Sequence, residues 1–113
     1  MSAQDKLQAF LQMLDSGQDG ALLRYSIGQE YLHANQPGEA VPHLQACLEQ
    51  DAGYSAAYKA LAEAQDHQGE VAACRTTLEH GIDVAAEKGD MQAKKEMEVY
   101  LRRLDKGKPM QNR

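Results

Sequence analysis

The amino-acid sequence predicts an all-α fold, a solenoid of about six antiparallel helices. Three observations support this prediction. Apolar residues recur at helical intervals, as in Leu7, Phe10, Leu11 and Leu14, and strand-like alternation is absent. Residues separated by a shift of 34 positions match in size. Turn-forming residues (Gly, Pro, Asp and Ser) separate the apolar stripes.

The internal repeat arranges the expected helices in pairs. A shift of 34 residues aligns Ile27 with Leu61 and Leu44 with Leu78. The same spacing of 34 residues aligns the N-terminal segment with the second helix of the first full pair. That segment therefore corresponds to half a repeat. The last helix matches the first helix of the first full pair at a spacing of 70 residues and is expected to cap the stack. Because a helix pair of this length cannot bury its apolar stripe alone, the units are expected to stack on one another.

The first three helices are expected at residues 3–15, 20–34 and 38–50. Asp-Ser-Gly and Gln-Pro-Gly sequences separate them, which are typical helix-ending and turn sequences. Pro42 lies inside the third segment, where proline lacks the N–H that a helical turn uses. We therefore expect this helix to begin late, near Gly38, or to bend slightly.

The last three helices are expected at residues 55–68, 70–87 and 90–105. Asp-Ala-Gly-Tyr, Gln-Gly and Gly-Asp sequences precede or separate them. Together the six helices predict a single domain over residues 1–105, consistent with a chain of 113 residues. Residues 106–113 follow as a flexible C-terminal tail.

Composition excludes several classes of protein. The chain carries 12 Lys and Arg against 17 Asp and Glu, a net charge of -5, which does not favour nucleic acid as a partner. A mean hydropathy of -0.63, with no apolar run near the length of about 20 residues that a bilayer requires, predicts no contact with a membrane. The N-terminus has no signal-peptide pattern, so a cytoplasmic location is expected. Cys47 and Cys74 are then expected as reduced, buried thiols.

The charge is unevenly distributed along the chain. Residues 1–86 hold 4 basic and 12 acidic side chains, whereas residues 87–113 hold 8 basic and 5 acidic side chains. The basic end is either a well-solvated last helix or a functional basic edge.

The repeat resembles the tetratricopeptide repeat (TPR) family, whose unit is a 34-residue pair of antiparallel helices. The resemblance covers residues 3–104 and is that of a small stand-alone bacterial-type protein. The sequence departs from the family pattern at Arg24, where the family favours Trp, and at Gln65, where it favours Tyr. The positions that match the family are Ile27-Gly28, Tyr31, Ala40, Leu44 and Cys47-Leu48, then Tyr58, Leu61-Ala62, Gly69, Cys74, Leu78 and Gly81-Ile82.

No pattern in the sequence predicts catalysis, a cofactor or a metal site. Nucleophile-elbow, phosphate-loop and dinucleotide-binding motifs are absent, as are compact metal-ligand spacings. His33 and His67 are one repeat apart, which places them on neighbouring helices about 10 Å apart, too far to share a metal ion without a third ligand. We therefore expect a protein that is not an enzyme and binds no cofactor.

The resemblance implies a concave groove lined by the first helix of each pair. A protein or peptide is the implied partner, held as acidic residues beside an apolar anchor. The basic edge of the groove is expected to come from Lys59 together with residues of the last helix. The residues expected in the peptide-binding groove are Tyr25, Gln29, Leu32, His33, Lys59, Glu63, His67, Lys95, Val99 and Arg102.

Two functional readings remain open. The first is an adaptor that binds a protein segment in this groove. The second is a structural module that self-associates as a homo-oligomer or packs into a larger assembly. The clamp by which some family members hold chaperone C-termini is not expected, because its positions hold other residue types here: Tyr25, Gln29, Ala60, Gln92 and Glu96.

Overall fold

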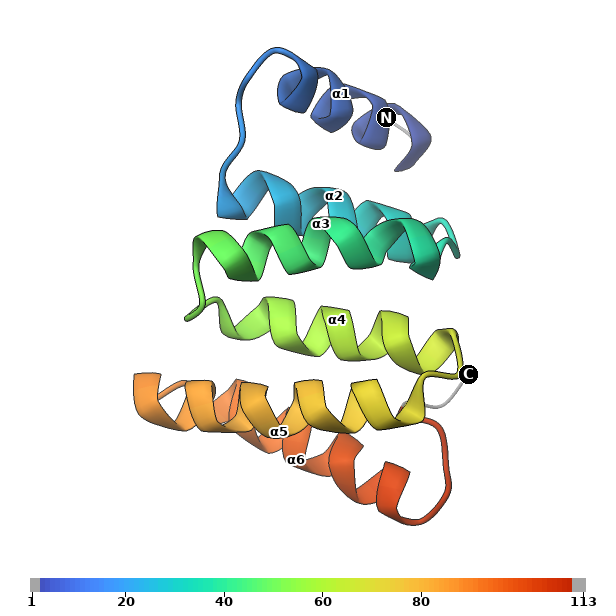
Figure 1. Ribbon diagram of the computed structural model, residues 1–113, viewed down its shortest axis with the longest axis vertical. Helices are drawn as coiled ribbons and strands as arrows, with labels where there is room; N and C mark the ends of the chain where they lie inside the picture. The colour runs from blue at the N-terminus through green and yellow to red at the C-terminus, as the bar shows by residue number, and fades with distance from the viewer. Residues whose placement is uncertain (1–2, 111–113) are drawn as a thin grey trace.

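The computed structural model describes residues 3–110, and within that range it contains six helices and no strand. The helices lie across the long axis of the molecule and follow one another in chain order from one end to the other (Figure 1). This arrangement confirms the all-α solenoid. The helices are α1 (Ala3–Asp15), α2 (Ala21–His33), α3 (Pro37–Gln50), α4 (Ser55–His67), α5 (Val71–Lys88) and α6 (Met91–Asp105).

Helix α3 begins earlier than the sequence suggested. It starts at Pro37, so Pro42 lies inside the helix rather than close to its first turn. The early start is accommodated because Pro37 occupies the first turn, where no helical N–H is required, and the backbone N–H groups of Glu39 and Ala40 donate to the Gln36 carbonyl. Gly38, whose carbonyl Pro42 cannot bond, is an exposed residue.

Two apolar clusters form the core. One is built from α3 and α4, with Leu44 and Leu61 among its buried members. The other is built from α4, α5 and α6, with Leu78 and Met97 fully buried in it. Since α4 contributes to both clusters, it is the central helix of the stack.

Two glycines allow neighbouring helices to approach closely. A Cβ added at Gly28 would lie 2.5 Å from Cδ2 of Leu44, and one added at Gly81 would lie 2.6 Å from Cβ of Tyr58. Real atoms do not approach this closely, so each glycine permits a helix contact that a side chain would prevent. Gly28 joins α2 to α3, and Gly81 joins α5 to α4.

The segment after α6 does not project away from the domain over residues 106–110. The chain reverses at Gly107, which has φ of +73°, and Met110 is fully buried in the second apolar cluster. The sequence predicted a flexible C-terminal tail over residues 106–113. Met110, five residues beyond the last helix, packs into the core, so this part of the expected tail contacts the domain. Residues 111–113 lie outside the described residues.

Candidate functional site

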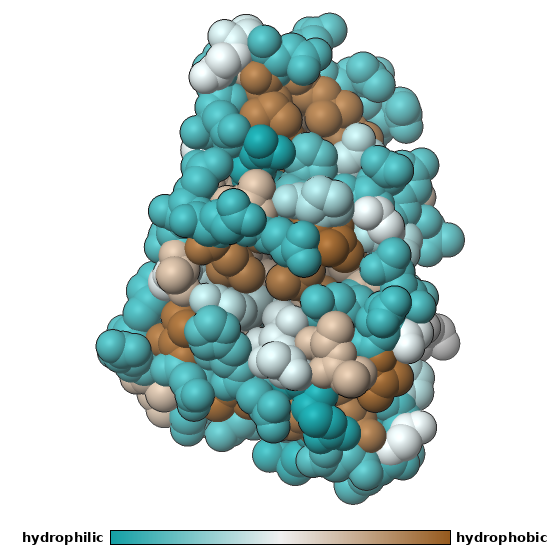
Figure 2. Space-filling model, viewed as in Figure 1, coloured by the Kyte–Doolittle hydropathy of each residue, from teal (hydrophilic) through white to brown (hydrophobic). Residues whose placement is uncertain are grey.

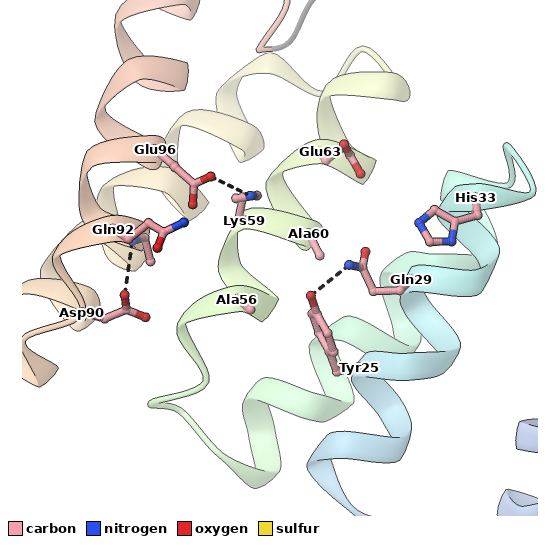
Figure 3. Close-up of a pocket in the computed structure, with 11 residues that line it drawn as sticks. Tyr25, Gln29, His33, Ala56, Lys59, Ala60, Glu63, Asp90, Gln92 and Glu96 are labelled. Carbon is pink, nitrogen blue, oxygen red and sulfur yellow. Dashed lines mark hydrogen bonds and ion pairs between the residues drawn. The ribbon is translucent and has the colours of Figure 1, made fainter.

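The first helices of successive pairs, α2 and α4, lie next to each other, and α6 lies beyond α4 in the same way. Their shared face contains a groove of about 490 Å³ (Figure 3). Side chains of all three helices and of the residue before α6 line it. The lining residues are Tyr25, Gln29, His33, Ala56, Lys59, Ala60, Glu63, Asp90, Gln92, Ala93 and Glu96.

The α2 wall of the groove carries the aromatic ring of Tyr25 and the side-chain amide of Gln29. Nε2 of Gln29 donates to the Tyr25 hydroxyl at 2.9 Å, which fixes the orientation of both side chains (Figure 3). The ring of Tyr25 packs against that of Tyr54, with centroids 5.0 Å apart. Burial raises the pKa of Tyr25, so its phenol stays neutral and available for hydrogen bonding. This wall can therefore contact an apolar side chain and bond a peptide group.

An ion pair joins the α4 wall to the α6 wall. Nζ of Lys59 lies 3.3 Å from Oε2 of Glu96 and 5.9 Å from the centre of the Tyr100 ring. Both charged side chains remain more than a third exposed. Lys59 is therefore paired with a carboxylate of the groove itself, in a surface ion pair that contributes little to stability.

The start of α6 is positioned by Asp90. Its Oδ1 accepts a hydrogen bond from the backbone N–H of Ala93 at 3.2 Å, which caps the helix. Gln92, Ala93 and Glu96, in the first two turns of α6, form the α6 wall.

The structure brings together five of the ten residues expected in the groove. Tyr25, Gln29, His33, Lys59 and Glu63 line it.

The other five expected residues lie outside the lining. Leu32 packs against the apolar cluster of α3 and α4, and His67 is exposed in the last turn of α4. Lys95, Val99 and Arg102 are exposed on a neighbouring face of α6.

The difference on α6 is one of helical register. Neighbouring residues on a helix point about 100° apart, so Lys95 points to one side of the direction taken by Glu96. The positions that match the chaperone clamp do enter the lining. On α6 they are Gln92 and Glu96, which are four residues apart, as Tyr25 and Gln29 are on α2. Ala56, Asp90 and Ala93 were not anticipated in the groove.

The expected basic edge of the groove is not what the structure shows. Nε of Arg103 donates to the carbonyl of Pro109, outside the groove. Lys94 lies 3.6 Å from Glu98 on the α6 surface. The charged residues of the lining are three carboxylates, Glu63, Asp90 and Glu96, with Lys59 and the exposed His33. The groove is therefore acidic rather than basic.

A second, more apolar cleft of about 320 Å³ lies between α1 and α2. Phe10, Met13, Leu22 and Leu23 contribute its apolar lining. Met13 and Leu22 are exposed, the latter to 68%. Figure 2 shows hydrophobic side chains gathered at this end of the molecule.

The two thiols lie inside the helical stack, Cys47 on α3 and Cys74 on α5. Both Cys47 and Cys74 are buried. Burial, with a smaller effect of the nearby Asp51 carboxylate, raises the pKa of Cys47 to about 11, so its thiol stays protonated at neutral pH.

The described part of the chain holds no group of three or more His, Cys, Asp or Glu side chains that could bind a metal ion. Nor does any helix between residues 3 and 110 combine the length and apolarity needed to cross a membrane.

Comparisons with known proteins agree with this architecture. A family model described as tetratricopeptide repeat matches residues 31–97. A TPR repeat-containing protein of Pseudomonas aeruginosa is 44% identical over 102 residues, which is 90% of this chain and 97% of that protein. The solution structure of a protein from Bordetella parapertussis superposes with a TM-score of 0.80 at 38% identity, covering 95% of this chain and 90% of that one. With the repeat period, the stacked helix pairs and these matches in agreement, the chain belongs to the tetratricopeptide repeat family.

Proposed function

We propose that the protein is a cytoplasmic, non-enzymatic adaptor that binds a segment of another protein in the concave groove of α2, α4 and α6. Tetratricopeptide repeats generally mediate protein–protein interactions and are generally non-catalytic modules. The observation that carries the proposal is the groove itself, which joins an aromatic and amide wall on α2 to a charged wall on α4 and α6.

The charge of the lining sets the expected ligand. Glu63, Asp90 and Glu96 outnumber Lys59, which Glu96 already neutralises. A segment with a Lys or Arg beside an apolar residue complements this groove, with the cation near the carboxylates and the apolar side chain against Tyr25. This replaces the acidic ligand that the sequence suggested. Because one small groove buries little area, the affinity is expected to be about micromolar.

The test is a capture experiment from extract of the source cells, with purified protein on a support. Glu63→Lys reverses a charge in the groove, and Glu79→Lys makes the same change on the exposed surface of α5 as a matched control. We expect Glu63→Lys to lose the specific partners and Glu79→Lys to retain them. Each captured partner is then titrated with the protein at low and high salt, where binding should weaken as salt rises.

Circular dichroism of both variants must match the wild type for the comparison to count. If Glu63→Lys is folded and still captures every partner of the wild type with unchanged affinity, the groove is not the binding surface.

A second candidate function, self-association, is favoured by the exposed apolar side chains beside the α1–α2 cleft. Leu22 in particular is largely exposed at the end of the stack. Light scattering at two protein concentrations tests this, with Leu22→Asp as the disruptive variant. Val71→Asp serves as control because Val71 is an exposed apolar residue on α5. A mass that grows with concentration, and returns to the monomer in Leu22→Asp alone, supports the structural-module function.

A further inference from the structure

The five residues after α6 fold back along the stack rather than leaving it. The backbone N–H groups of Gly107 and Lys108 donate to the carbonyls of Leu104 and Arg103, each at 2.9 Å, which ends the helix and reverses the chain. Nε of Arg103 then donates to the carbonyl of Pro109 at 2.9 Å. Met110 consequently lies beside the C-terminal end of α4, two helices earlier in the sequence.

Met110 is the point at which this segment meets the core. Its side chain is fully buried, and its Sδ lies 3.9 Å from Sγ of Cys74 on α5. Its backbone N–H donates to Oδ2 of Asp66 on α4 at 3.0 Å. Asp66 is itself buried, with 8% of its surface exposed. Asp66 and the apolar surface around Cys74 together form a site that we call the Met110 socket.

The contacts of Met110 in the socket are of the same kinds as those by which proteins bind peptides. A fixed acceptor bonds one main-chain N–H, and an apolar pocket takes the side chain of the same residue. Methionine suits such a pocket because its unbranched, polarizable side chain adapts to irregular space. Over residues 105–110, Met110 is the buried residue and the other five are exposed. The segment therefore sits on the domain as a tethered ligand does, held through one anchoring side chain.

An anchor of this kind is expected to exchange. Fixing five residues of irregular chain costs conformational entropy that offsets most of the gain from burying one side chain and forming its hydrogen bonds. The covalent tether compensates, because it presents the segment to the socket at an effective concentration in the millimolar range. A free peptide of the same sequence competes poorly with the tethered copy but binds when that copy cannot.

We infer that the Met110 socket is a second peptide-binding site, separate from the concave groove. Residues 106–110 of the same chain fill this socket in cis, and the same sequence on another chain fills it in trans. The ligand is an extended Pro-Met segment whose methionine enters beside Cys74 and whose N–H bonds Asp66.

The test uses the full-length protein with Met110→Asp, which places a carboxylate where Asp66 repels it and empties the socket. The probe is the peptide of residues 106–110, labelled with a fluorophore at its N-terminus and amidated at its C-terminus. Fluorescence anisotropy should show saturable binding to Met110→Asp and at least about tenfold weaker binding to the wild type, whose socket is filled. The same peptide with Ser in place of Met keeps the charge and should bind neither protein.

Cys74 supplies an independent readout. In a Cys47→Ala background, the rate at which a thiol reagent modifies Cys74 should rise at least about tenfold in Met110→Asp, and the peptide should restore protection. Glu63→Lys, in the concave groove, should leave peptide binding to Met110→Asp unchanged, because the two sites are separate.

Equal binding of the peptide to wild type and Met110→Asp, or no saturation with Met110→Asp while its circular dichroism stays helical, would overturn the inference. If Met110→Asp loses helical structure, Met110→Ser takes its place with the same readouts. Loss of structure in both variants would show that Met110 is a fixed part of the core and not an exchangeable ligand.

Discussion

The two ends of the helical stack are closed in different ways. At the N-terminal end, α1 packs against α2 alone among the described helices, and an apolar cleft with exposed Met13 and Leu22 remains beside it. At the C-terminal end, α6 packs against both α5 and α4, and Met110 fills the core from outside the last helix. One end leaves apolar surface in contact with water and the other covers it.

The difference shows what the end of a repeat stack requires. Each internal helix has a neighbour on both sides, whereas a terminal helix must be polar outside or be covered by something else. The C-terminal end meets this requirement with a polar α6 surface and a folded-back tail. The N-terminal end does so incompletely, and its loop is held by polar contacts instead, with Asp19 bonded to Arg24 and to Gln50 of α3.

The largest expected effect comes from truncating one leucine at each end. Leu104 is 6% exposed in the C-terminal cluster, whereas Leu22 is mostly exposed. Leu104→Ala should lower the free energy of unfolding by about 2 to 5 kcal/mol, because it leaves a cavity. Leu22→Ala should change it by less than about 0.5 kcal/mol. Urea melts measure both, and equal losses would contradict the difference between the ends.

The next effect concerns local opening of the terminal helices. Because α1 rests on one helix, its amides should exchange with solvent at least about tenfold faster than those of α5, which packs between α4 and α6. Native-state hydrogen exchange followed by NMR measures this directly. Matching protection of α1 and α5 would mean that the stack opens only as a whole.

A smaller effect is expected at the close helix contacts. Gly81→Ala should destabilise by about 1 to 3 kcal/mol, because the new methyl group meets Cβ of Tyr58, which cannot move without its helix. At Gly28 the methyl group meets the side chain of Leu44, which can shift more readily than the Cβ of Tyr58, and alanine favours the helix, so Gly28→Ala should destabilise less, by about 1 kcal/mol. Thermal melts of the two variants give the comparison. A larger loss for Gly28→Ala would reverse it.

The smallest effect is a pH dependence at the N-terminal loop. Hydrogen bonds from Arg24 and Gln50 lower the pKa of Asp19 from 3.8 to about 2. A carboxyl whose pKa is lowered by folding stabilises the folded state above its unfolded pKa and loses that contribution as the pH falls through its folded pKa. A small part of the stability should therefore disappear between about pH 4 and pH 2. Urea melts across this range should show the dependence in the wild type and less of it in Asp19→Asn.

Helix positions could be predicted from the sequence because the signals that set them are local. Apolar spacing places each stripe, and Gly, Pro and Asp mark its ends, so the bounds of α1 agree with the prediction and those of α2 and α6 differ by one residue. The start of α3 at Pro37 was missed because two prolines in six residues gave conflicting signals.

The groove could be predicted only where the repeat is regular. Tyr25, Gln29 and Glu63 lie on α2 and α4, which the 34-residue period relates directly. On α6 the longer connection shifts the alignment by two residues, and Lys95 and Arg102 lie on a neighbouring face outside the lining. A rotation of one residue on a helix is enough to move a side chain out of a groove.

The sequence by itself therefore determined the helices, their pairing and the fold family, because these depend on the spacing of apolar and turn residues and on the 34-residue repeat along the chain. Only the tertiary structure decided which face of α6 turns inward, that Glu96 neutralises Lys59, and that Met110 returns to Asp66 and Cys74. Lys59 and Glu96 are 37 residues apart, and Met110 and Asp66 are 44 apart. Contacts at such separations follow from how the helices pack, and no local pattern of residues encodes them.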